Sequence, residues 1–293
     1  MNARLQKLAR SHQLTLFLLL TLGFSWGVYG IEFVSDSSLP PIAVYGPIIA
    51  AAIVTWLTGG NVRQWGRQLF IWRTSGRWYL IVLVGFPVVL VGGSTAIYVA
   101  LTGDTDGLAP GVLPERMWIV LLFLAYQILT AGLGEELGWR GFALPRLQDR
   151  YNALLASLII GVFWALWHFP LFFQPDSFQA QMGPIIYLMD GLTLSILFTW
   201  VYNSTGGSVL MAALLHGVYN TTLVLYPYEG ELDIAEFPYL LGVSRTVLLL
   251  VIAVLILAVY GRDLTSKESI PGREHAGGVP VDRPHNGGTV HED

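Results

Sequence analysis

The chain alternates between long apolar runs and short polar connections along most of its length. Eight apolar runs stand out, at about 14–34, 41–58, 78–101, 117–147, 153–173, 185–202, 208–226 and 246–261. Most are long enough to span a bilayer, since about 20 apolar helical residues cross its hydrocarbon core. The eighth run is short, and the fourth is longer than a bilayer requires, so we expect the fourth to tilt or to project. The pattern predicts an all-α fold, a polytopic membrane helix bundle with about eight transmembrane helices.

Composition favours a membrane protein over a soluble one. Of the 293 residues, 54% are hydrophobic and only 12% are charged, whereas soluble domains carry about 25% charged residues. The chain has no cysteine, which excludes disulfides, thiolate metal ligands and a cysteine nucleophile. No convincing small-residue cleavage pattern follows Leu14–Val28, so we interpret this run as the first span and not as a signal peptide.

Charges in the connections predict the orientation. Arginines lie at 60–77 and at 140–150, where they are Arg140, Arg146 and Arg150, whereas the alternate connections are acidic or neutral. Because cytoplasmic loops are enriched in Lys and Arg, we expect a multi-pass protein of the cell membrane with both termini in the cytoplasm. Residues 263–293 combine Gly, Pro, His and charge without apolar periodicity, and we expect them to form a disordered cytoplasmic tail.

Two adjacent carboxylates, Glu135 and Glu136, come at the end of an uncharged apolar run. Ionised groups inside a bilayer are costly and usually mark function. Glu136 and Arg140 are four residues apart, so they can pair along one helix face. Glu135 points about 100° away from Glu136. We therefore expect one structural carboxylate and one chemical carboxylate.

Further polar residues lie in later spans: His168, and then His216 and Asn220, which share a helix face because they are four residues apart. With a rise of about 1.5 Å per residue, Glu135, His168 and His216 lie about 18, 22 and 12 Å from the cytoplasmic ends of their helices. These depths fall in the middle of a core about 30 Å thick. A polar set at one depth favours function over simple helix packing. Asp190, at a depth of about 18 Å, is either a member of this set or a helix-packing residue.

These side chains favour hydrolysis. A carboxylate and an imidazole can deprotonate a water molecule, while a second imidazole and a carboxamide can donate hydrogen bonds to a developing oxyanion. Two histidines and a glutamate, here His168, His216 and Glu135, would equally hold a zinc ion with an open water position. The chain has neither a His-Glu-x-x-His helix nor a Gly-x-Ser-x-Gly elbow. A zinc-dependent and a metal-free mechanism both stay open at this point.

Three motifs, in this order, resemble one known family. They are Glu-Glu-x-x-x-Arg, aromatic-x-x-x-His and His-x-x-x-Asn, carried by Glu135, Glu136, Arg140, Trp164, His168, His216 and Asn220. The set resembles the CPBP intramembrane proteases, which include the type II CAAX prenyl endopeptidases and the Abi bacteriocin-immunity proteins. In that family the second motif usually opens with Phe, where this chain has Trp164.

The resemblance implies an integral membrane protease domain over residues 1–262, with the motif-bearing core at about 117–226. It implies hydrolysis of a peptide bond in a membrane-associated protein or peptide, of which a prenylated CAAX-like substrate is one form. The expected partners are the lipid bilayer and a membrane protein or peptide substrate, and no nucleic acid. The family is described both as metalloproteases and as glutamate-dependent, metal-free proteases.

The resemblance also assigns roles to residues. Glu135 and His168 would activate the water, and His216 and Asn220 would line the oxyanion side. In the metalloprotease description, His168, His216 and Glu135 would instead bind a divalent metal such as zinc. Three further residues would shape the site: Glu136, Arg140 and Trp164.

Two other classes of function use the same residues differently. A proton-coupled membrane transporter would use the Glu/His cluster as a relay, and it would contain inverted repeats or helices broken at the midplane. The sequence has no convincing internal repeat, although Gly183-Pro184 and Gly206-Gly207 interrupt its second half. A non-catalytic immunity or scaffold protein would keep the family fold without the activity.

Overall fold

The computed structural model describes residues 3–35, 41–103, 105, 117–226 and 238–266, and every regular element among them is helical. Six helical stretches are long and apolar enough to cross a membrane: Gln13–Ser35, Gly76–Thr102, Met117–Gln148, Ala153–Phe173, Phe178–Ser204 and Tyr239–Asp263. Two apolar helices are shorter, Ile42–Leu57 and Val209–Val224. The prediction of an all-α, polytopic helix bundle is therefore confirmed.

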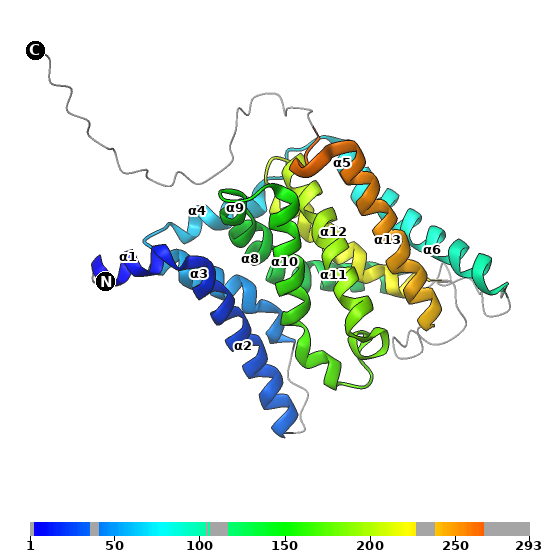
Figure 1. The fold of residues 1–293 in the computed structure, drawn as a ribbon, viewed down its shortest axis with the longest axis horizontal. Helices are drawn as coiled ribbons and strands as arrows, with labels where there is room; N and C mark the ends of the chain where they lie inside the picture. The colour runs from blue at the N-terminus through cyan, green and yellow to red at the C-terminus, as the bar shows by residue number, and fades with distance from the viewer. Residues whose placement is uncertain (1–2, 36–40, 104, 106–116, 227–237, 267–293) are drawn as a thin grey trace, which may run out of the picture.

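Several stretches consist of consecutive helical elements (Figure 1). The first half contains α1 (Ala3–Ser11), α2 (Gln13–Ser35), η1 (Ile42–Tyr45), α3 (Gly46–Leu57), α4 (Val62–Gly66), η2 (Arg67–Phe70), α5 (Gly76–Leu80), η3 (Ile81–Gly85) and α6 (Phe86–Thr102). The second half contains α7 (Met117–Gln127), η5 (Ile128–Gly132), α8 (Leu133–Gly138), η6 (Trp139–Ala143), α9 (Leu144–Gln148), α10 (Ala153–Trp167), η7 (Phe169–Phe173), α11 (Phe178–Ser204), α12 (Val209–Thr221), η8 (Thr222–Val224), α13 (Tyr239–Tyr260) and η10 (Gly261–Asp263).

The helices that carry the motifs lie at the centre of the bundle. Figure 1 shows α8, α10, α11 and α12 in the middle, with α2 and α3 on one side and α6 and α13 on the other. Most residues of α12 are buried, whereas α2 is apolar and yet buries only four. An apolar helix that stays exposed within the bundle is expected to face lipid. The central helices can therefore hold polar groups that the outer helices shield.

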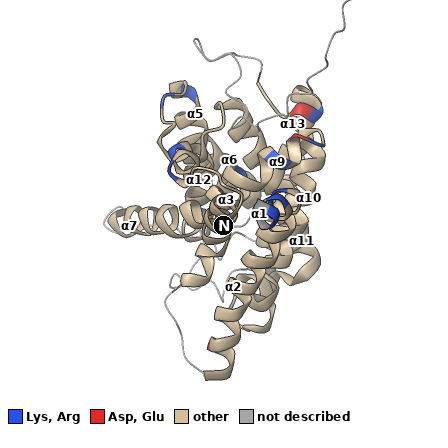
Figure 2. Ribbon diagram, turned by 90° about the vertical axis from the view of Figure 1, so that its left-hand side faces the viewer, with Lys and Arg blue, Asp and Glu red and all other residues tan. Residues whose placement is uncertain are grey.

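The motif-bearing helix runs without a break from Met117 to Gln148, but two segments within it have a different hydrogen-bond pattern. The segments η5 and η6 are π-helical, and they flank α8, which carries both glutamates. Such π turns inside α-helices are frequent at functional sites. In Figure 2, α7 projects sideways from the bundle, across the direction of α2. The first part of the long fourth run therefore projects from the bundle.

Glycines within and just before the first motif let neighbouring helices approach the motif-bearing helix closely. A Cβ atom at Gly138 would lie 2.6 Å from the carbonyl carbon of Pro47, at the start of α3. A Cβ atom at Gly132 would lie 2.6 Å from the carbonyl oxygen of Ala213 in α12. Small residues allow such close backbone packing in membrane helices. These two glycines therefore bring the backbones of α3 and α12 against the helix that carries the glutamates.

Basic side chains gather at one end of the bundle. Arg10 Nε donates to the carbonyl of Thr58 at 2.8 Å, and Arg146 Nε donates to Gln13 Oε1 at 2.8 Å. These bonds join α1, the end of α3, the end of α9 and the start of α2. Figure 2 shows Lys and Arg around α1, α5 and α9. The connections predicted to be acidic or neutral at the opposite end include positions outside the described residues, at 104, 106–116 and 227–237.

Two details of the predicted pattern are wrong. The eighth helix begins at Tyr239 instead of 246, and Arg245 is buried within it. The sixth run, 185–202, agrees with the part of α11 that follows the kink at Gly183, where φ is +73°. Arg140 is fully buried inside the long helix and is not part of a polar connection. The orientation therefore depends on the other basic residues.

Replacing Gly138 with alanine should lower the melting temperature of the detergent-solubilised protein. The added Cβ would force α3 away from the motif-bearing helix, and overpacking of this kind typically costs about 1–3 kcal/mol. The matched control is Gly92→Ala in α6, where a Cβ meets nothing within 4 Å and should be neutral or slightly stabilising. Equal melting temperatures for the two variants would contradict the close approach.

Candidate active site

Glu136 on α8 is completely buried and contacts two partners. Arg140 Nη1 lies 2.9 and 3.0 Å from its two carboxylate oxygens. His216 Nδ1, from α12, lies 2.8 Å from Oε1. The ion pair expected from the spacing of Glu136 and Arg140 is therefore formed, and it reaches a second helix through the histidine.

Arg140 is also fully buried and is held from several sides. Its guanidinium carbon lies 4.5 Å from the ring centroid of Phe198 and 5.4 Å from that of Trp164. Nη2 donates to Ser195 Oγ at 3.3 Å. A cation over an aromatic face gains about 2 kcal/mol or more when it is desolvated. The aromatic residue of the second motif thus contacts the arginine of the first.

Glu135 has weaker partners than its neighbour. Its Oε2 accepts a hydrogen bond of 2.6 Å from the indole Nε1 of Trp164, and its Oε1 lies 3.9 Å from His216 Nε2. A phenylalanine at position 164 would have no N–H to donate. The Trp found in place of the usual Phe therefore adds a hydrogen-bond donor to this carboxylate.

His216 lies between the two glutamates. The Glu136 carboxylate is paired with Arg140 and acts as a hydrogen-bond acceptor, so Nδ1 of His216 carries the hydrogen between them. The other ring nitrogen, Nε2, is then directed toward Glu135. The ring packs against Trp164 and Phe198, with centroid distances of 5.5 and 5.4 Å. This imidazole links the strongly paired carboxylate to the weakly paired one.

His168 caps the C-terminal end of α10. Its Nδ1 lies 2.8 Å from the carbonyl oxygen of Trp164. A carbonyl oxygen can only accept, so Nδ1 carries the hydrogen and Nε2 of the neutral ring is left as an acceptor. The ring is oriented by Trp167 and Tyr187, at centroid distances of 4.6 and 5.2 Å. A fixed imidazole with one basic nitrogen is suited to accept a proton.

Glu135, His168 and Asn220 line one cavity of about 220 Å³. A water molecule occupies about 30 Å³ in the liquid, so the space exceeds that of a single water. The remaining lining residues are Tyr29, Pro41, Val44, Tyr126, Gln127, Thr130, Ala131, Trp167, Leu171 and Gln179. Tyr126 is exposed to the exterior of the bundle. The cavity therefore reaches the surface beside α7.

Gln127 is a site residue that sequence reasoning missed. It ends α7, directly before the π turn η5. Its Oε1 accepts a hydrogen bond of 3.0 Å from Nδ2 of Asn220. A single Gln at the end of an apolar run matches no motif, although its polarity at that depth was a signal.

The structure brings the predicted site residues to one region. Their spacing along the chain did not reveal which of them line the cavity and which pack behind it. Glu135, His168 and Asn220 line the cavity, whereas His216 packs behind Glu135. Asp190 does not join them, because its carboxylate pairs with Arg245 of α13 at 2.9 Å. Of the two alternatives for Asp190, the structure supports helix packing.

The zinc-dependent alternative requires His168, His216 and Glu135 to converge on one metal ion. In the part of the chain that the structure describes, no three His, Asp or Glu side chains converge in a way that would hold a metal ion. His168, His216 and Glu135 in this arrangement therefore do not fit a three-ligand zinc site.

Fold and site together define a multi-pass integral membrane protein with a buried Glu/His centre. Residues 117–222 match the family model described as type II CAAX prenyl endopeptidase Rce1-like. A segment of 138 residues is 33% identical to CAAX prenyl protease 2 of Methanococcus maripaludis, and it covers 45% of this chain and 50% of that protein. The chain thus spans half the length of this curated relative. Residues 117–222 are therefore similar to the Rce1-like type II CAAX prenyl endopeptidases, and this match confirms the resemblance that the three motifs indicated.

Replacing Glu136 with glutamine should lower both the folded yield and the melting temperature. The change leaves Arg140 buried without a counter-charge, which typically costs about 3–5 kcal/mol. The double variant Glu136→Gln/Arg140→Met leaves no unpaired arginine and should melt above the single variant. If the single variant is as stable as the unchanged protein, the ion pair of Glu136 and Arg140 does not stabilise the fold.

Proposed function

We propose that this protein is an intramembrane endopeptidase that hydrolyses a peptide bond of a membrane-associated protein or peptide. The main support is that a weakly paired carboxylate, Glu135, and an oriented imidazole, His168, line the same cavity inside an apolar bundle. A prenylated CAAX-like protein is the substrate class that we favour. The similarity to CAAX prenyl protease 2 of Methanococcus maripaludis supports this choice.

In the proposed mechanism a water molecule binds between Glu135 and Nε2 of His168. Glu135 takes a proton from the water while the water oxygen attacks the carbonyl carbon of the scissile bond. The same proton then passes to the amide nitrogen, so that the C–N bond breaks to give a carboxylic acid and an amine. The Trp164 indole N–H, 2.6 Å from Oε2, holds the carboxylate in a fixed orientation.

Of the two residues expected on the opposite side of the substrate carbonyl, Asn220 keeps this role here, because it lines the cavity whereas His216 packs behind Glu135. One N–H of the Asn220 amide is used by Gln127, and the second is available for a developing oxyanion. A preorganised donor of this kind typically contributes about 10²–10³-fold to the rate. His216 acts from behind Glu135, where a protonated ring would stabilise the ionised carboxylate. Glu136, Arg140 and Trp164 fix the positions of these groups.

We further propose that residues 1–262 form one membrane domain of eight spans, which includes the two shorter apolar helices Ile42–Leu57 and Val209–Val224. The basic end of the bundle faces the cytoplasm in this proposal, together with both termini. The tail proposed at 263–293 lies outside the described residues from 267 onward.

Glu135→Gln should reduce turnover of a membrane peptide by about 10²–10⁴-fold, the range typical of a lost acid–base group. The substitution keeps the size of the side chain, so the melting temperature should change little. Cleavage is measured in lipid vesicles with a prenylated CAAX peptide and with its unprenylated form. The control is Asp149→Asn, the same chemical change on an exposed carboxylate.

Near-normal turnover by Glu135→Gln would rule out the assigned base. A transporter or a non-catalytic immunity protein would cleave neither peptide in any variant. Stoichiometric zinc that is lost together with activity would contradict the metal-free mechanism.

Cysteine labelling should place the positions after 110 and after 232 on the outer face of the membrane. The chain has no cysteine of its own, so single cysteines can be introduced without background. A membrane-impermeant reagent added to intact cells should label both positions and should leave Arg150→Cys unlabelled until the cells are lysed. Protection of either outer position would contradict the orientation.

A further inference from the structure

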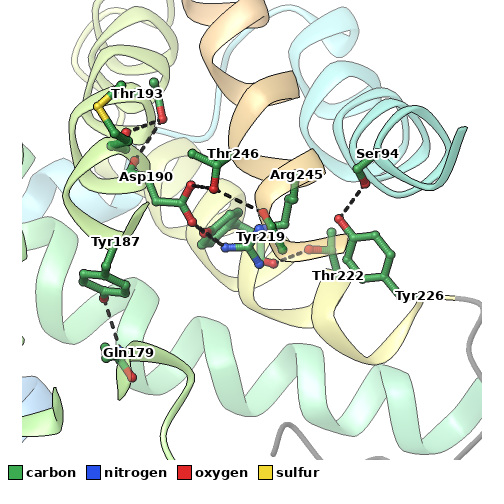
Figure 3. A network of polar contacts seen from close by, with 12 residues as sticks. Ser94, Gln179, Tyr187, Asp190, Thr193, Tyr219, Thr222, Tyr226, Arg245 and Thr246 are labelled. Carbon is green, nitrogen blue, oxygen red and sulfur yellow. Dashed lines mark hydrogen bonds and ion pairs between the residues drawn. The ribbon is translucent and has the colours of Figure 1, made fainter. Parts of the chain in front are cut away.

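A second buried polar cluster joins three helices beside the candidate active site (Figure 3). Asp190 of α11 accepts hydrogen bonds from Arg245 Nη2 at 2.9 Å and from Thr246 Oγ1 at 2.6 Å, both on α13. The hydroxyl of Tyr219, on α12, lies 3.4 Å from Asp190 Oδ2 and also contacts Arg245 Nη2. One carboxylate thus connects α11, α12 and α13.

This cluster matters for the stability of the fold because its charged groups are buried. Arg245 is 0% exposed and Asp190 is 2% exposed. A buried charge that loses its partner is strongly destabilising, so Asp190 and Arg245 must stay together in the folded state. The pair forms a fixed point on α11 and α13, and the Tyr219 hydroxyl ties α12 to it.

Two residues that contact Arg245 are direct sequence neighbours of residues that line the cavity. Tyr219 precedes Asn220 on α12, and both the Tyr219 ring and the Phe178 ring lie 4.7 Å from the Arg245 guanidinium. Phe178 in turn precedes Gln179, which lines the cavity and donates to the hydroxyl of Tyr187 at 3.2 Å. The arginine therefore contacts the neighbours of two cavity-lining residues on two helices.

We propose that Asp190, Arg245 and Tyr219 form a positioning cluster that holds Asn220 and Gln179 at the cavity wall. This inference rests on the proposed peptidase function and extends it to three residues outside the motifs. None of the three is assigned a contact with substrate. Their effect is geometric, because a misplacement of about 1 Å in a catalytic group can cost about 10²-fold in rate.

The test uses Tyr219→Phe, which removes a single hydroxyl and keeps the ring. We expect kcat for the membrane peptide to fall about tenfold, which is less than the roughly 10²-fold loss that a displacement of about 1 Å in a catalytic group can cause. KM should stay within about twofold, since no group that binds substrate is removed. The matched control is Ser94→Ala, which deletes another buried hydrogen bond, 2.9 Å from Ser94 to Tyr226, and removes no hydrogen bond of Asp190, Arg245 or Tyr219. This control should keep the kcat of the unchanged protein.

A second measurement does not depend on activity. Hydrogen–deuterium exchange in lipid nanodiscs should be faster over residues 214–222 in Tyr219→Phe than in Ser94→Ala or the unchanged protein, because α12 has lost its anchor. Unchanged exchange there, or a kcat loss that only follows the unfolded fraction, would overturn the positioning role. If the unchanged protein cleaves no peptide, the proposed function fails, while the exchange data still decide whether the cluster anchors α12.

Discussion

Burying a charge inside a helix bundle is costly unless an opposite charge is buried with it. This constraint explains how the charged groups in the interior of the protein are paired. Among the described residues, three carboxylates are buried: Glu135, Glu136 and Asp190. Arg140 lies 2.9 Å from Glu136, and Arg245 lies 2.9 Å from Asp190. Glu135 has a neutral donor at 2.6 Å and an imidazole at 3.9 Å. The carboxylate with the weakest pairing is the one that lines the cavity, so two adjacent glutamates can have different tasks.

The sequence predicted helices well where a helix must be apolar throughout. The fourth run, 117–147, nearly coincides with Met117–Gln148, because a helix that faces lipid tolerates few polar residues. The same reasoning failed at α13, where Arg245 was taken to lie before the helix. Its partner, Asp190, comes 55 residues earlier in the chain. No local pattern reports a pairing over that distance.

For the candidate site, too, the sequence predicted contacts within one helix but not contacts between helices. The contact between Glu136 and Arg140 follows from their spacing on one helix. His216 and Asn220 have that same spacing, yet His216 contacts Glu136 while Asn220 contacts Gln127. Which way each side chain turns depends on the helices packed around α12, and the helical period carries no such information. Periodicity therefore identified the residues and not their partners.

The π turn before α8 has a consequence for how such a helix can diverge during evolution. A π turn holds one residue more than regular α-helix, and each residue corresponds to a rotation of about 100°. Deleting one residue within Ile128–Gly132 would restore regular helix and turn α7 by that angle relative to α8. Gln127 would rotate away from Asn220, while Glu136 and Arg140 would keep their pairing. Insertions and deletions of single residues at this turn can thus remodel one wall of the cavity while the buried charges stay matched.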